Sequence, residues 1–80
     1  MKRVEPPELN DPGFWRGRLG EKVTMRLRNP RDAAHPFTEA VGVLRSLSAD
    51  ESGEPEVTVL TRRGEARGGR VSDILAAKLL

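Results

Sequence analysis

The chain contains no cysteine and no tyrosine, and it has one histidine and one tryptophan among its 80 residues. Without cysteine it can form neither a disulfide framework nor a thiolate nucleophile, and it cannot bind zinc or an iron–sulfur cluster through sulfur. It also lacks a run of 18 apolar residues, and its N-terminus, MKRVEPPELN, has no apolar stretch of the signal-peptide kind. The sequence therefore predicts a cytoplasmic protein with no membrane partner.

Eighty residues suffice for one small domain, because two separately folding halves would each be too small to bury a core. Fourteen Lys and Arg against 12 Asp and Glu leave a net charge of +2, too little by itself to indicate a nucleic-acid binder. The charge is unevenly placed, since basic blocks at residues 13–35 and 62–80 flank an acidic block at residues 36–61. A fold that joined the two basic blocks would form a positively charged face.

Four segments have the pattern of short β-strands: residues 21–28, 38–47, 56–62 and 65–71. The first alternates strictly between apolar and polar side chains, which places Val23, Met25 and Leu27 on one face. The second alternates only in its first half, so we expect a bulge or bend near Gly42 or Arg45. Strands at this spacing in so short a chain predict a small antiparallel barrel or a strongly bent sheet.

The predicted core consists of apolar side chains on the inner faces of these strands and in the C-terminal segment: Val23, Met25, Leu27, Val41, Val43, Leu47, Val57, Val59, Val71, Ile74 and Leu79. Burying these side chains roughly balances the conformational entropy that the chain loses on folding. The domain is therefore expected to be only marginally stable alone, as a monomer or a weak homodimer.

Residues 1–13 are predicted to be a flexible tail ahead of a single domain at residues 14–80. Three prolines in this segment interrupt regular structure, and Val4 and Leu9 are too few to anchor it.

Two short helical turns are expected. Asp11 is suited to cap a turn that begins at Pro12. Near the C-terminus, residues 72–80 fit either a helix capped by Ser72 or a short 3₁₀ turn followed by a final strand. We favour the 3₁₀ turn and strand, because an isolated short helix is marginal in water while a last strand would close the sheet.

Several motifs are shared with a known domain family: Gly20–Val23, Arg26–Arg28, Thr38–Leu44, Val59–Gly64 and Val71–Lys78. Through them residues 19–80 resemble the small SH3-like barrel found at the N-terminus of certain actinobacterial GNAT-type acetyltransferases and in short stand-alone actinobacterial proteins of unknown function. The resemblance implies an all-β fold, a small SH3-like barrel of about five antiparallel strands with a short 3₁₀ turn before the last. It implies no catalytic residue, because the sequence does not include the acetyltransferase domain. One departure is EARGGR, at residues 65–70, where such domains have a hydrophobic strand.

No set of residues supports catalysis, metal binding or a cofactor. His35 lies in the proline-containing stretch AAHPF, and the sequence has no G-x-S-x-G nucleophile elbow. The acidic stretch at residues 50–56 lacks the ligand spacing of a calcium loop and is predicted to be a solvated turn. No glycine-rich phosphate-binding loop is present either. The sequence therefore predicts a protein that is not an enzyme and has no cofactor.

The stretch RRGEARGGR, at residues 62–70, interleaves arginines with glycines as nucleic-acid-binding RGG segments do. Glycine there also suits a hairpin turn, and no aromatic residue lies nearby in sequence to stack on bases. The preferred prediction is a non-enzymatic interaction or accessory module with an unknown protein partner. The alternative is a nucleic-acid-binding barrel in which the first strand and this hairpin share an arginine-rich face: Arg26, Arg28, Arg62, Arg63, Arg67 and Arg70.

Overall fold

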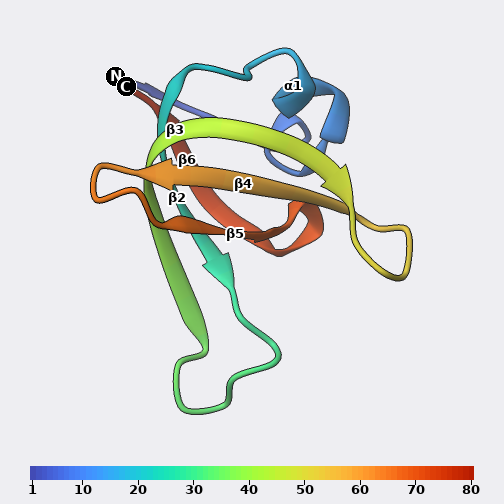
Figure 1. The fold of residues 1–80 in the computed structure, drawn as a ribbon. Coiled ribbons are helices and arrows are strands. Elements are labelled where there is room, and N and C mark those ends of the chain that lie inside the picture. The colour runs from blue at the N-terminus through green and yellow to red at the C-terminus, as the bar shows by residue number, and fades with distance from the viewer.

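Six antiparallel strands form the framework of the computed structural model, which describes residues 1–80 (Figure 1). The strands are β1 (Lys2–Arg3), β2 (Lys22–Arg28), β3 (Phe37–Ala49), β4 (Pro55–Thr61), β5 (Ala66–Arg70) and β6 (Ile74–Leu79). Short helical segments accompany them: η1 (Glu8–Asn10), α1 (Pro12–Arg16) and η2 (Val71–Asp73). All six strands belong to one sheet in the order β1-β6-β2-β3-β4-β5. The all-β prediction is confirmed, but the sheet is open and has six strands rather than about five.

β2 lies between β3 and β6 near the middle of the sheet. Its faces are the predicted ones, because Val23, Met25 and Leu27 are buried while the residues between them face outward. Val57 and Val59 of β4 are buried in the same core. These two strands supply much of the apolar layer on which the other elements pack.

β3 is the longest strand and pairs with different neighbours along its length. It pairs with β2 from its start, and with β4 from Gly42 onward. The register with β4 shifts between Leu44 and Ser46, which confirms the irregularity predicted near Gly42 or Arg45 and places it at Arg45. Gly42 permits the close approach of the two strands, because a Cβ atom there would overlap the carbonyl oxygen of Leu60.

The inner face of β3 is not the predicted one. The sequence pattern places Val41 and Val43 in the core, but Val41 is 52% exposed and Val43 is only partly buried. Ala40 and Leu44 are buried instead. Displacing a strand assignment by one residue exchanges its two faces. Gly42 lies on the same face as Ala40 and Leu44, where the approach of β4 leaves no room for a side chain at this position, and Val41 and Val43 lie on the opposite face.

The first 13 residues pack against the sheet, although the sequence predicts a flexible tail. β1 pairs with the end of β6, and the Val4 N–H donates to the Ala77 carbonyl over 2.9 Å. The side chains of Val4 and Leu9, which we expected to be too few to anchor the segment, are both buried. The two ends of the chain consequently lie side by side (Figure 1).

Hydrogen bonds made by three side chains hold the rest of this N-terminal segment. The Trp15 indole N–H donates to the Leu9 carbonyl over 2.8 Å, and the indole is fully buried. The Asn10 side-chain amide donates to the carbonyls of Val71 and Ile74 over 2.9 and 3.0 Å. At the start of α1, Asp11 accepts from a backbone N–H as the predicted N-cap. Polar contacts of this kind have no hydrophobic pattern, which explains why the sequence did not reveal the packing.

The C-terminal segment consists of the 3₁₀ turn η2 followed by β6, as the favoured interpretation predicts. Val71, Ile74 and Ala77 from this segment are buried. The other predicted core residues of the C-terminal and β3 segments, Leu79 and Leu47, are partly buried against the core. No helix is both long and apolar enough to cross a membrane.

Candidate functional site

The structure divides the six predicted arginines into two groups. Four of them surround Glu39 on β3, and we call this set the basic face: Arg26, Arg62, Arg63 and Arg67. The other two, Arg28 and Arg70, line a separate hollow of about 400 Å³ beside the β2–β3 loop. The hollow that Arg62, Arg63 and Arg67 border beside Glu39 shares no lining residue with this one.

Arg26 and Arg67 reach Glu39 from opposite sides. The Arg26 Nε lies 3.7 Å from a carboxylate oxygen of Glu39, and its guanidinium lies over the Phe37 ring at 5.0 Å from the centroid. Arg67, on β5, donates to the backbone carbonyl of Glu39 over 3.5 Å and to the Glu65 carboxylate over 3.3 Å. Side chains from β2 and from the β4–β5 hairpin therefore meet here.

Arg62 and Arg63 occupy the turn between β4 and β5, which closes at Gly64 with a φ of +85°. Both side chains are exposed, and neither is in an ion pair. They border a hollow of about 350 Å³ that also includes Val41 and Thr61. These two guanidiniums are therefore free to bind an anionic group.

Arg70 is held by the acidic turn rather than presented to solvent. Its Nε donates to the Asp50 carboxylate over 2.7 Å, and an Nη donates to the Ser52 hydroxyl oxygen over 3.3 Å. The Asp50 carboxylate is only 8% exposed and also accepts from the Ser52 hydroxyl and from the N–H groups of Ser52 and Glu54. Arg70 thus fixes the β3–β4 turn against the start of η2, and its guanidinium is already occupied.

These contacts lower the pKa of Asp50 well below its ordinary value of 3.8. The hydrogen bond from Ser52 is the largest cause, and the hydrogen bond from Arg70 and those from backbone N–H groups add to it against the effect of burial. The pKa of Arg70 is raised in turn by Asp50.

A lowered pKa means that ionised Asp50 stabilises the fold fully above pH 3.8, and that this contribution is lost as the pH falls toward the folded-state value. Asp50→Asn is therefore expected to lower the unfolding midpoint at pH 7. The difference from the wild type should shrink steadily between pH 4 and pH 2. Urea unfolding of both proteins across this range measures it, and a difference independent of pH would show that the Asp50 charge is not responsible.

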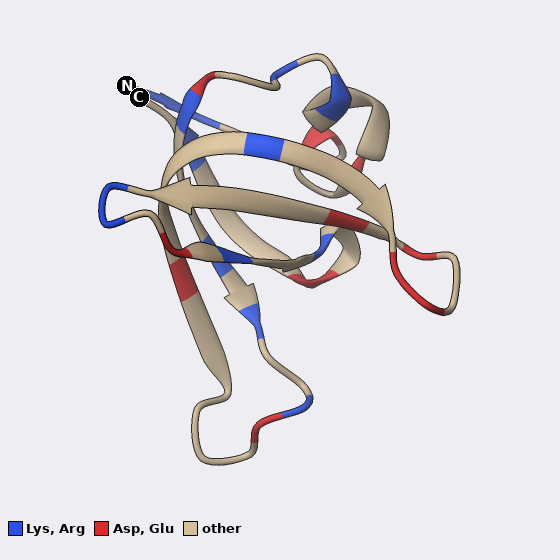
Figure 2. Cartoon of the chain, in the orientation of Figure 1, with Lys and Arg blue, Asp and Glu red and all other residues tan.

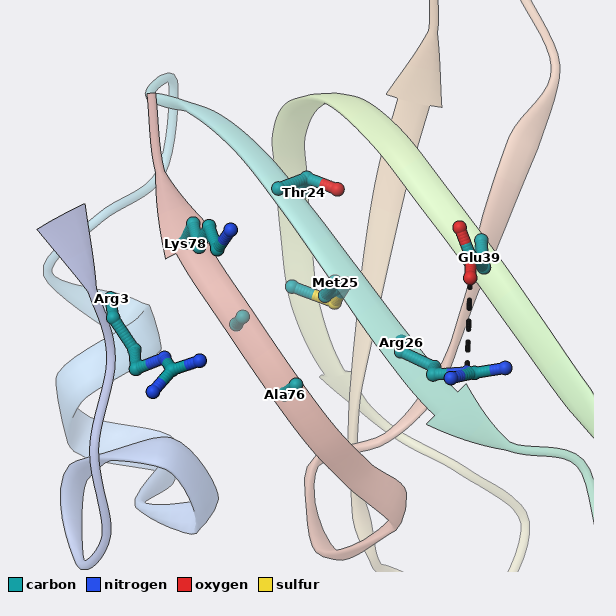
Figure 3. A pocket seen from close by; sticks show the side chains of 8 residues that line it. Arg3, Thr24, Met25, Arg26, Glu39, Ala76 and Lys78 are labelled. Atoms are coloured by element: carbon teal, nitrogen blue, oxygen red, sulfur yellow. Dashed lines mark ion pairs between the residues drawn. The ribbon is translucent and has the colours of Figure 1, made fainter. Parts of the chain in front are cut away.

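Two cations that the sequence did not indicate lie next to the basic face. Arg3 of β1 is paired in register with Lys78 of β6, and both line a hollow of about 190 Å³ with Arg26 and Glu39 (Figure 3). Ala76 of β6, which pairs with Arg26 of β2, lies between Arg3 and Arg26, and its short side chain does not fill this hollow (Figure 3). No sequence pattern indicated Arg3, because it lies in the predicted tail at residues 1–13.

The charged turns lie at opposite ends of β4. The acidic residues of the β3–β4 turn gather at one end of the molecule, and the basic β4–β5 turn lies at the other (Figure 2). A strand of seven residues separates them by about 20 Å. The acidic β3–β4 turn is therefore too distant to neutralise the basic face, whose only paired carboxylates are those of Glu39 and Glu65.

His35 lies in the exposed β2–β3 loop, and its Nδ1 is 3.2 Å from a carboxylate oxygen of Asp32. No group of three or more His, Cys, Asp or Glu side chains is placed to bind a metal ion.

No known protein family, no curated protein and no solved structure matches the chain.

Proposed function

We propose that the protein is a non-enzymatic interaction module that binds a protein partner through the basic face. The observation that carries this proposal is the meeting of four arginines from both basic blocks around Glu39, with Arg62 and Arg63 unpaired. Two exposed apolar side chains, Phe37 and Val41, lie on the same side of β3 as Glu39. Arginine and aromatic side chains are enriched at protein interfaces.

The fold that presents this face is proposed to be an SH3-like barrel. Two features support it: the order β6-β2-β3-β4-β5 within the sheet, and the 3₁₀ turn η2 between β5 and the last strand. Curvature brings β5 toward β2 as well, since Gly69 approaches the Leu27 side chain to ordinary contact distance. The N-terminal β1 would then be an addition at the edge of β6.

Nucleic-acid binding by the same face is the second candidate, because β2 and the β4–β5 hairpin both contribute arginines to the basic face. A single exposed aromatic side chain, Phe37, is available there for stacking on a base. The sugar–phosphate backbone would have to supply most of the affinity, which would make binding strongly dependent on salt.

The double variant Arg62→Glu/Arg63→Glu is expected to weaken binding of an anionic probe roughly tenfold at low salt, because it removes both unpaired guanidiniums. The control is Arg16→Glu/Arg45→Glu, which changes the net charge equally at two exposed arginines outside the basic face. The probes are an acetylated ten-residue peptide of alternating Glu and Val, a mixed-sequence DNA duplex and a single-stranded oligonucleotide. Backbone-amide NMR titration at two salt concentrations measures the affinities.

Peptide binding that the basic-face variant weakens and the control does not would support the protein-partner proposal. Steeply salt-dependent binding of the oligonucleotides with no peptide binding would favour the second candidate instead. Equal losses in both variants would show that net charge alone governs binding, which would overturn the assignment of the face.

A further inference from the structure

The first half of β3 has a strand on only one side. β3 pairs with β2 from Phe37 onward, whereas its pairing with β4 begins at Gly42. The backbone from Phe37 to Val41 therefore forms a strand edge that no neighbouring strand pairs on its second side (Figure 1). We call this segment the β3 edge.

The backbone groups of alternate residues in this edge point away from β2. Leu44 donates to the Glu21 carbonyl over 2.9 Å and accepts from the Gly20 N–H over 2.8 Å, so both of its groups face the chain entering β2. Successive residues of a strand direct these groups to opposite sides. The N–H and C=O groups of Phe37 and Glu39, an odd number of residues from Leu44, therefore point away from β2. The contact from Arg67 on β5 to the Glu39 carbonyl agrees with this direction.

Unpaired N–H and C=O groups along a strand are a template on which an extended chain can pair. Most edges are protected by a charged or proline-containing neighbour, and here the contact from Arg67 covers one carbonyl at a long 3.5 Å. An incoming strand could displace it at little cost. The hollow between this edge and the β4–β5 turn, about 350 Å³, leaves room beside Glu39 and Val41.

We infer that the β3 edge binds an extended acidic segment of a partner protein, which adds to the sheet as a further strand beside β3. This inference rests on the proposed function and specifies its partner. Main-chain hydrogen bonds to Phe37 and Glu39 would supply affinity, as in other strand-addition complexes. Carboxylates of the segment would face Arg62 and Arg63, which border the same hollow.

Charge identifies the occupant. A second copy of this chain paired edge to edge would bring its own Arg62, Arg63 and Arg67 toward those of the first copy, and like charges at an interface are unfavourable. The carboxylates of Glu39 and Glu65 are already engaged by Arg26 and Arg67, so they do not neutralise the turn. An acidic segment meets two unpaired guanidiniums without such repulsion.

The test uses the alternating Glu–Val peptide and two versions of it, one N-methylated at every valine and the other at every glutamate. In a strand, only every second residue directs its N–H group toward a given neighbouring strand. One version should therefore bind about tenfold or more weakly than the other on the wild-type protein. The amide protons of Phe37 and Glu39 should also exchange about tenfold more slowly when the unmodified peptide is bound.

A matched pair of variants tests the same edge from the protein side. Glu39→Pro removes an N–H that the β2–β3 ladder does not use, a position where a strand tolerates proline. Glu39→Gln removes the same charge and keeps the N–H. We expect Glu39→Pro to weaken peptide binding about tenfold relative to Glu39→Gln.

Equal binding of the two methylated peptides would overturn strand addition, and this measurement needs no variant that could fail to fold. If the Arg62→Glu/Arg63→Glu variant still weakens binding in that case, the proposed function survives without the inference. If the methylated peptides bind equally and the Arg62→Glu/Arg63→Glu variant also binds the peptide as the wild type does, both strand addition and the proposed function are overturned. Binding confined to oligonucleotides would overturn both as well.

Discussion

Replacing Trp15 by alanine is expected to lower the free energy of unfolding by about 3–5 kcal/mol. The indole is fully buried, and it is the largest side chain in the core. Its removal leaves a cavity between α1 and the sheet and also leaves the Leu9 carbonyl without its donor. Small domains have a total stability of only about 5–15 kcal/mol, so the variant should lose a large part of its stability. Circular dichroism during urea unfolding measures the loss.

Trp15→Phe separates the two contributions. Phenylalanine keeps most of the apolar contact and loses only the indole N–H, so a smaller loss of about 1–3 kcal/mol is expected from the unpaired carbonyl and the remaining gap. Equal stability of Trp15→Ala and the wild type would show that the N-terminal segment does not pack as described. That result would restore the predicted flexible tail at residues 1–13.

The elements with a regular pattern were predictable from sequence. β2 alternates strictly because one face packs on the core and the other meets solvent, and the structure shows those two faces. The cap at Asp11 and the bulge at Arg45 follow from local chemistry and from a change of phase, and both are present. Such features depend on neighbours in sequence, which a single chain displays directly.

The features that the sequence did not predict depend on contacts between distant residues. The two faces of β3 were exchanged because the approach of Gly42 to Leu60 is a property of the folded sheet. The packing of the N-terminal segment relies on hydrogen bonds such as those from Asn10 to Val71 and Ile74, separated by more than 60 residues.

The candidate site was predictable only as a list of arginines. The sequence shows two basic blocks, but the pairing of the strands decides which of their arginines lie close together. Arg67 reaches the strand next to Arg26, whereas Arg70, three residues later, faces the acidic turn and binds Asp50. The unpaired edge of β3 leaves no trace in the sequence at all, because it arises from where pairing with β4 begins.

Gly68→Ala is expected to lower the free energy of unfolding by about 1–3 kcal/mol, the usual effect of forcing an extra methyl group into a filled space. A Cβ atom at Gly68 would overlap the carbonyl oxygen of Val57 and lie 2.9 Å from its carbonyl carbon. These are backbone atoms of β4, so β5 would have to move away from its neighbour. Thermal or urea unfolding of the purified variant measures the effect.

Gly69→Ala provides the matched control one residue further along the same strand. Its Cβ atom would lie 3.5 Å from the Leu27 side chain, an ordinary contact. Alanine there should leave stability unchanged or raise it by about 0.4–1 kcal/mol through a less flexible unfolded chain. Opposite signs at adjacent glycines would mean that this glycine pair serves strand packing and not the flexibility of an RGG segment. Equal, small effects, with loss of oligonucleotide binding in both variants, would instead favour the nucleic-acid candidate.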